Sequence, residues 1–112
     1  MALISGSGGA VFVGTDETHS DVVITPVGEL DLAFGPTVLA AIREAIAGAP
    51  RRIVLDLASV TFLDSGGGDM LAEAQRDARK AGVRLELRTE MTPMVRRILT
   101  VTMLLDAFDP AD

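Results

Sequence analysis

A strand, a helix and a second strand follow one another between residues 53 and 88, and this order limits the folds open to the chain. Residues 53–57 (Ile-Val-Leu-Asp-Leu) are nearly all apolar, as in a central strand covered on both faces. Residues 70–81 place apolar side chains on one side of a helical pattern, and residues 83–88 alternate between apolar and charged side chains. Strands joined through a helix pair in parallel, so the sequence predicts a layered α/β fold.

The segments on either side of this unit add further strands and helices. Residues 10–13 and 21–25 read as strands that pair in a hairpin, and Pro26 either ends the second strand or marks an unpaired edge in it. A helix is expected from Phe34 to the Gly-Ala-Pro stop at residues 48–50, and another from Thr92-Pro93 onward. The order β-β-α-β-α-β-α predicts one mixed sheet of four to five strands with three to four helices packed on one face.

Length and composition narrow the class of protein. With 112 residues and no long linker, we expect a single domain over residues 1–112, in which residues 1–9 are a flexible N-terminal lead-in. Cysteine is absent, which excludes disulfides and thiolate metal sites. The one histidine, His19, falls in a polar turn, so a zinc site or a Ser-His-Asp triad is not expected.

Charge and hydropathy indicate where the chain acts. The net charge of −6 argues against direct binding to nucleic acid and favours a partner protein with a basic face. No run approaches the roughly 18 uninterrupted apolar residues of a membrane span, and residues 1–10 lack the features of a signal peptide. We therefore expect a cytoplasmic protein that does not enter the membrane.

The junction between the central strand and the following helix holds the most informative residues, Asp64-Ser65-Gly66-Gly67-Gly68-Asp69. A hydroxyl at the start of a helix lies near unpaired N–H groups, where an added anion is tolerated. On spacing alone, Asp64 or Ser65 could equally be a structural N-cap. The glycines, however, oppose helix formation and remove bulk around Ser65, which favours a serine presented to another protein.

Other chemistry fits this junction poorly. A phosphate-binding P-loop would need Gly-Lys-Ser/Thr after the glycines, and a nucleophile elbow would need a general base that only His19 could supply. Asp31, Asp56 and Asp64 could in principle hold Mg²⁺ at the strand ends, although Asp56 is as well explained as a strand-face residue. We expect no catalytic residue and no metal site.

A second junction, Gly28-Glu29-Leu30-Asp31, also follows a strand and precedes a helix. The equivalent ends of parallel strands meet at one edge of a sheet. We therefore expect Asp31 and Ser65 to be close neighbours.

Four ordered motifs resemble the STAS-domain family of anti-sigma-factor antagonists. Residues 28–31 look like its Gly-Glu-Leu-Asp turn, residues 53–63 like its central strand, and residues 92–99 like its Ser-Pro-x-Val-x-Arg-x-Leu helix. Asp64-Ser65-Gly66-Gly67 is similar to its Asp-Ser-(Ser/Thr/Ala)-Gly, whose first serine is the phosphorylation site. The chain departs from the family at Gly68 and Asp69, where Gly-Leu-Gly-Val-Leu is usual, and it leaves room only for a short final strand or none.

This resemblance implies a regulator and not an enzyme, with no cofactor. Ser65 would be the phosphorylated residue; Asp31, Asp64, Gly66, Gly67, Gly68 and Asp69 would meet the partner. The unphosphorylated form would bind an anti-sigma factor that is also a serine kinase of the histidine-kinase-like ATPase type, which releases a sigma factor, and a phosphatase would restore that form. The alternative is a non-switching STAS scaffold or a subunit that regulates a transporter; a homodimer is left open.

Overall fold

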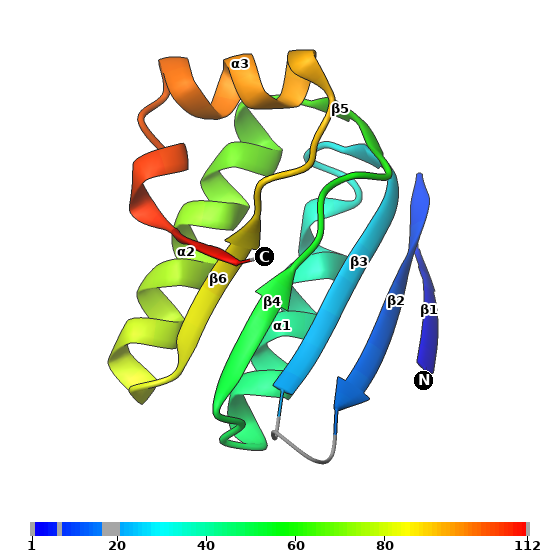
Figure 1. The fold of residues 1–112 in the computed structure, drawn as a ribbon. Coiled ribbons are helices and arrows are strands. Elements are labelled where there is room, and N and C mark those ends of the chain that lie inside the picture. The colour runs from blue at the N-terminus through cyan, green and yellow to red at the C-terminus, as the bar shows by residue number, and fades with distance from the viewer. Residues whose placement is uncertain (1, 7, 17–20, 112) are drawn as a thin grey trace.

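The computed structural model describes residues 2–6, 8–16 and 21–111 and shows a mixed β-sheet with helices on one face (Figure 1). The strands are β1 (Ala2–Gly6), β2 (Gly9–Asp16), β3 (Asp21–Leu30), β4 (Arg52–Leu55), β5 (Val60–Leu63), β6 (Arg84–Arg88) and β7 (Asp109–Ala111). The sheet runs β1-β2-β3-β4-β6-β7, and β5 pairs with the far end of β3. The β1-β2 and β2-β3 pairs are antiparallel, whereas all later pairs are parallel.

Three α-helices and one short 3₁₀-helix occur in the described residues: α1 (Gly35–Ala47), α2 (Ser65–Ala81), α3 (Pro93–Val101) and η1 (Leu105–Ala107). In Figure 1, α1 and α2 cover one face of the sheet, and α3 crosses the end of the sheet near β5. The core lies between the sheet and the helices, where the fully buried side chains include Phe34, Ile42, Leu55, Leu71 and Leu99. None of the described helices is both long and apolar enough to cross a membrane.

The predicted fold class is confirmed, with more strands than expected. The hairpin of β2 and β3, the central β4, the parallel β6 and the helices α1 and α3 all lie where the sequence patterns indicate. Three short strands, β1, β5 and β7, raise the number of strands to seven in the described residues. The final strand is present but has only three residues.

We expected a flexible lead-in over residues 1–9, but residues 2–6 form the strand β1. Residues 2–6 pair antiparallel with β2, so that Leu3 lies opposite Phe12 and Ile4 opposite Val11. A Gly-rich segment read by itself has little intrinsic strand propensity. Here the neighbouring strand supplies the hydrogen-bond partners that stabilise the extended conformation.

Strand β3 does not end at Pro26 or break at Gly28, because its partner changes along its length. It pairs with β4 up to Ile24, opposite Leu55, and with β5 from Gly28 onward. Ile24 accepts from the amide of Asp56, and the amide of Gly28 donates to Ser59, so Pro26 faces the gap between the two partners. A residue without an N–H fits such a gap, which agrees with the predicted unpaired edge.

Helix α2 begins at Ser65, five residues before the start expected from the apolar pattern at Met70. The glycines at 66–68 therefore form the first turn of the helix and not a loop before it. Their weak helix propensity is outweighed by the capping and close packing described below. The helix ends as predicted at Gly82, which adopts φ 72°.

Candidate functional site

The two predicted junctions lie side by side because β3 and β5 end together. Leu30 is paired with Leu63, so Asp31 and Asp64 each follow the last residue of neighbouring parallel strands. The amide of Asp64 also donates to the carbonyl of Leu30 at 3.4 Å. The turn that begins at Asp31 and the start of α2 are therefore neighbours, as the sequence predicted.

Asp64 is the N-cap of α2. Its Oδ1 accepts a hydrogen bond from the amide of Gly67 at 2.9 Å, and its backbone carbonyl accepts from the amide of Gly68 at 2.9 Å. This arrangement satisfies donors that the first turn would otherwise leave unpaired. The capping alternative thus holds for Asp64, and it leaves the neighbouring serine without that task.

Ser65 is the first residue of α2 and is exposed. Within the described part of the chain, its hydroxyl makes no hydrogen bond. Being at the positive end of a helix of 17 residues, it is placed where the helix dipole favours negative charge. The geometry presents a free hydroxyl at a position that tolerates an added anion.

Asp31 shapes the turn before α1. Its Oδ1 accepts from the amide of Phe34 at 2.8 Å, and its carbonyl accepts from the amide of Gly35 at 2.8 Å. The turn leaves Leu32 with 76% of its surface exposed. Sequence reasoning missed Leu32, although an apolar residue inside a polar turn was a usable signal.

Two of the three glycines pack closely against the chain itself, a role that the sequence did not indicate. Gly67 is buried, and a Cβ there would lie 2.1 Å from the carbonyl oxygen of Leu30. At Gly66 the nearest atom would be the Cα of Leu32, at 3.0 Å. Gly68 is also buried, but a Cβ there would meet only the end of the Leu104 side chain, at 3.4 Å. Gly66 and Gly67 let α2 start directly beside the Asp31 turn.

A hollow lies on each side of the start of α2. One, of about 390 Å³, opens toward α3 and is lined by Asp64, Ser65, Gly68, Asp69, Ala72, Ile98, Thr102 and Leu104. The other, of about 240 Å³, opens toward α1 and is lined by Leu32, Gly35, Pro36, Leu39, Gly66, Asp69, Met70 and Glu73. Asp69 is exposed between them. The α3 side of the first hollow was not foreseen, because its residues come from a distant part of the sequence.

The surface around Ser65 is acidic. Asp31, Asp64 and Asp69 form no ion pair in the described residues, and neither hollow is lined by lysine or arginine. Farther along α2, Glu73 and Asp77 are both bound by Arg43 of α1, at 2.8 and 2.7 Å. The carboxylates near the serine are therefore available to a basic partner, whereas Glu73 and Asp77 are already bound.

The suggested Mg²⁺ cluster does not assemble. Asp56 pairs with Arg88 at 2.9 Å and accepts from the amide of Ala58 at 3.0 Å, which ties it to its own turn. Among the described residues, no group of three or more potential acidic, histidine or cysteine ligands converges. His19, expected in a solvated turn, lies outside the described residues.

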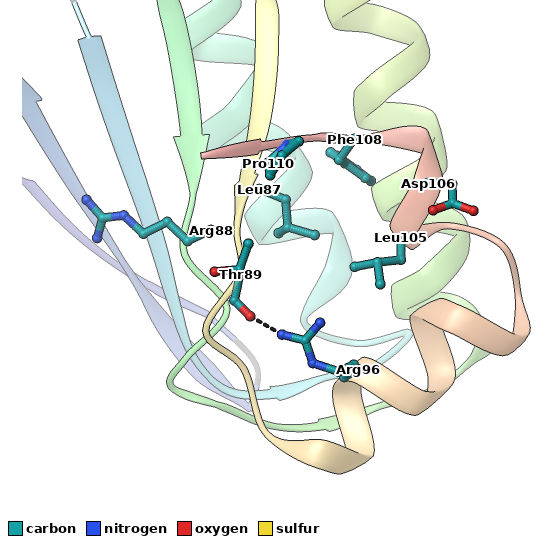
Figure 2. A pocket seen from close by; sticks show the side chains of 8 residues that line it. All are labelled: Leu87, Arg88, Thr89, Arg96, Leu105, Asp106, Phe108 and Pro110. Carbon is teal, nitrogen blue, oxygen red and sulfur yellow. Dashed lines mark hydrogen bonds between the residues drawn. The ribbon is translucent and has the colours of Figure 1, made fainter. Parts of the chain in front are cut away.

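A separate hollow of about 290 Å³ lies at the C-terminal edge of the sheet. Figure 2 shows Leu87, Leu105, Phe108 and Pro110 around it, with Arg96 donating to the carbonyl of Thr89. None of the predicted site residues lines it. It is therefore not part of the Ser65 surface.

Comparison with known proteins places this architecture in a family. Residues 13–106 match the family model described as "Mlab, STAS domain". A search of curated proteins found no match.

Solved structures of anti-sigma-factor antagonists share the fold. An antagonist from Mycobacterium paratuberculosis is 27% identical with a TM-score of 0.76, over 96% of this chain and 89% of that one. The antagonist SpoIIAA in its unphosphorylated form is 25% identical with a TM-score of 0.73, over 91% and 88%. The Bacillus cell fate determinant SpoIIAA in its phosphorylated form is 25% identical with a TM-score of 0.66, over 91% of each chain. The chain therefore belongs to the STAS-domain family, and its structural neighbours include anti-sigma-factor antagonists.

Proposed function

We propose that this protein is an anti-sigma-factor antagonist whose binding is controlled by phosphorylation of Ser65. The observation that carries the proposal is the exposed Ser65 hydroxyl beside a cap that Asp64 already provides. The same family fold is known for SpoIIAA in both unphosphorylated and phosphorylated forms, which supports a switch of this kind. In this proposal the protein itself is a regulator and not an enzyme.

The partner is an anti-sigma factor that is also a serine kinase of the histidine-kinase-like ATPase type. The unphosphorylated face offers apolar Leu32, two hollows and the carboxylates of Asp31 and Asp69, which suit a partner surface that is basic and partly apolar. Binding that partner releases a sigma factor. Within this scheme, phosphorylation by the kinase ends the complex and a phosphatase restores it, all in the cytoplasm.

The partner surface around the site is basic in this proposal, but a carboxylate or bound nucleotide phosphate of the kinase lies opposite Ser65. Charge repulsion at that point would weaken the complex once Ser65 carries a phosphate. A phosphoserine carries about −1.5 to −2 charges at neutral pH. Each unit of this charge repels each unit of negative charge on a partner carboxylate or bound nucleotide phosphate. At a separation of about 8 Å and an effective dielectric constant of about 20, each such pair of charges costs about 2 kcal/mol. Two or three such pairs weaken binding by roughly a thousandfold or more without any change of fold.

The proposal is tested by incubating the protein with ATP and each serine kinase encoded beside it. We expect a mass gain of one phosphate, assigned to Ser65 by fragmentation. The gain is lost in Ser65→Ala and kept in Ser59→Ala, a matched variant at another exposed serine. If no kinase modifies Ser65, or if phosphorylation leaves kinase binding unchanged, the switch is refuted.

A second candidate is a STAS domain that binds its partner through the same face without phosphorylation, as a scaffold or as a transporter-regulating subunit. The exposed Asp69 beside Ser65 favours it, because its charge would oppose a phosphate at the same helix end. A partner captured equally well by the wild type and by Ser65→Glu would identify this case.

A further inference from the structure

The outer edge of the sheet is formed by β1, which pairs only with β2. One side of its backbone therefore presents N–H and C=O groups that have no strand partner within the described residues. Such a row is a template for pairing with another strand. The strand packs closely against α1: a Cβ added at Gly6 would lie 2.4 Å from the hydroxyl oxygen of Thr37.

Both faces of β1 carry apolar side chains and no charge, and its one polar side chain is Ser5. On one face, Leu3 is 58% exposed and lies opposite Phe12, which is 37% exposed. On the other face, Ala2 and Ile4 line a hollow of about 250 Å³ against Ala41 and Ala45 of α1. A strand that is apolar on both faces is typical of a sheet interior, not of an edge in water.

The opposite edge of the same sheet shows how an edge is normally protected. β7 has three residues, Asp109-Pro110-Ala111, which combine short length, a charge and a proline. All three devices discourage a further strand from pairing. The five residues of β1 contain none of them, and residues 1–15 contain no Asp, Glu, Lys or Arg.

The occupant that fits this edge best is a second copy of the same chain. Two copies with a net charge of −6 repel one another over most of their surfaces, and the uncharged β1 edge is where that repulsion is weakest. A basic partner would find no carboxylate on β1 itself, although Glu44 of α1 lines the hollow beside it. Antiparallel pairing of two identical strands is also self-complementary, as a two-fold dimer requires.

We propose that two copies of this chain pair antiparallel through β1, which joins their sheets across a two-fold axis. Main-chain hydrogen bonds between the two β1 strands supply the contact, and Leu3 of each copy packs beside the partner's β1 on one face of the joined sheet. The inference does not depend on Ser65, which belongs to α2.

Sedimentation equilibrium of the full chain, from micromolar to millimolar concentration, tests the dimer. We expect the wild type to approach twice the chain mass of 11.8 kDa. Leu3→Lys places like charges close across the axis and should weaken dimerisation about tenfold or more. Val101→Lys is the matched control, since Val101 is 74% exposed on α3, away from β1, and it should dimerise like the wild type.

Hydrogen exchange gives a second readout that does not require the variants. Amides of residues 2–6 should gain protection as the wild-type concentration rises, and circular dichroism should show that both variants are folded. A wild type that stays monomeric throughout overturns the proposal. So does a dimer that Leu3→Lys leaves intact, or one that Val101→Lys disrupts equally.

Discussion

At the scale of single residues, the adjacent Asp64 and Ser65 have separate roles at the start of α2. The carboxylate of Asp64 binds the amide of Gly67, whereas the hydroxyl of Ser65 is exposed and makes no bond in the described residues. Helix capping therefore needs only the first of the two. We therefore expect a change at Ser65 to leave the fold intact.

This division of roles predicts different stabilities for two alanine variants. Asp64→Ala should lower the free energy of unfolding by about 1 kcal/mol, as expected for loss of a side-chain cap. Ser65→Ala should change it by less than about 0.5 kcal/mol, as for an exposed position without a structural contact. Urea unfolding of both variants measures the difference. Equal losses would mean that Ser65 also caps the helix.

The neighbouring glycines differ in the space around them. Gly67→Ala would place a Cβ 2.1 Å from the backbone oxygen of Leu30, which cannot move away easily. We expect it to lower the free energy of unfolding by about 2 kcal/mol or more. Gly68→Ala meets only a flexible leucine end at 3.4 Å, so its gain in helix propensity should leave stability equal or raised by up to about 1 kcal/mol. Thermal unfolding of the pair checks this, and a similar loss in both would contradict it.

At the scale of elements, charged side chains join β3, β4 and β6 at the end of the sheet away from Ser65. Asp21 is bound by Arg51 at 3.0 Å and Arg52 at 2.9 Å, and Arg52 also binds Glu86 at 2.7 Å. Asp21 and Glu86 are both buried. Burial raises the pKa of Asp21, but the hydrogen bond from Arg52 and the charges of Arg51 and Arg52 outweigh it and lower that pKa below its ordinary value. The bond to Asp21 raises the pKa of Arg52, which stays charged.

These contacts predict a loss of stability in acid. Because the pKa of Asp21 is lower in the folded state, the unfolded state binds more protons as the pH falls. The stabilisation is complete above the ordinary pKa of 3.8 and is lost as the pH falls through the lower folded value. In urea unfolding, the wild type should therefore have a higher free energy of unfolding than Asp21→Asn. The difference should be full at neutral pH and should shrink as the pH falls below 3.8.

An exposed carboxylate serves as the control for this pH dependence. Asp106→Asn, in η1, should unfold with the same pH dependence as the wild type. If the difference in free energy of unfolding between the wild type and Asp21→Asn stays constant down to strongly acidic pH, the charge of Asp21 does not contribute to that difference.

At the scale of the whole molecule, a net charge of −6 and the unpaired carboxylates near Ser65 should steer a basic partner toward the candidate site. If the proposed kinase binds there, its association rate should fall as salt rises, while the dissociation rate changes less. Stopped-flow or surface-binding kinetics at several salt concentrations measure both rates. Asp69→Asn should reduce the salt dependence, and Asp109→Asn, at the exposed β7 edge, should not. A salt-independent association rate would exclude electrostatic steering.

The sequence by itself determined the α/β class, the hairpin, the central strand, the limits of α1 and the start of α3. These depend on local signals: apolar periodicity, and proline or glycine at helix ends. It also placed Asp31 and Ser65 at neighbouring strand ends, because parallel pairing follows from the order of elements. Each of these inferences needs only residues that are close in the chain.

Only the tertiary structure decided the early start of α2, the partner change along β3 and the presence of β1. The glycines of α2 look unfavourable for a helix until Leu30 and Leu32 are placed against them. β1 looks flexible until β2 offers its hydrogen bonds, and the hollow beside Ser65 forms only when α3 packs near α2. These features depend on contacts between residues distant in sequence, whose free energy no local pattern records.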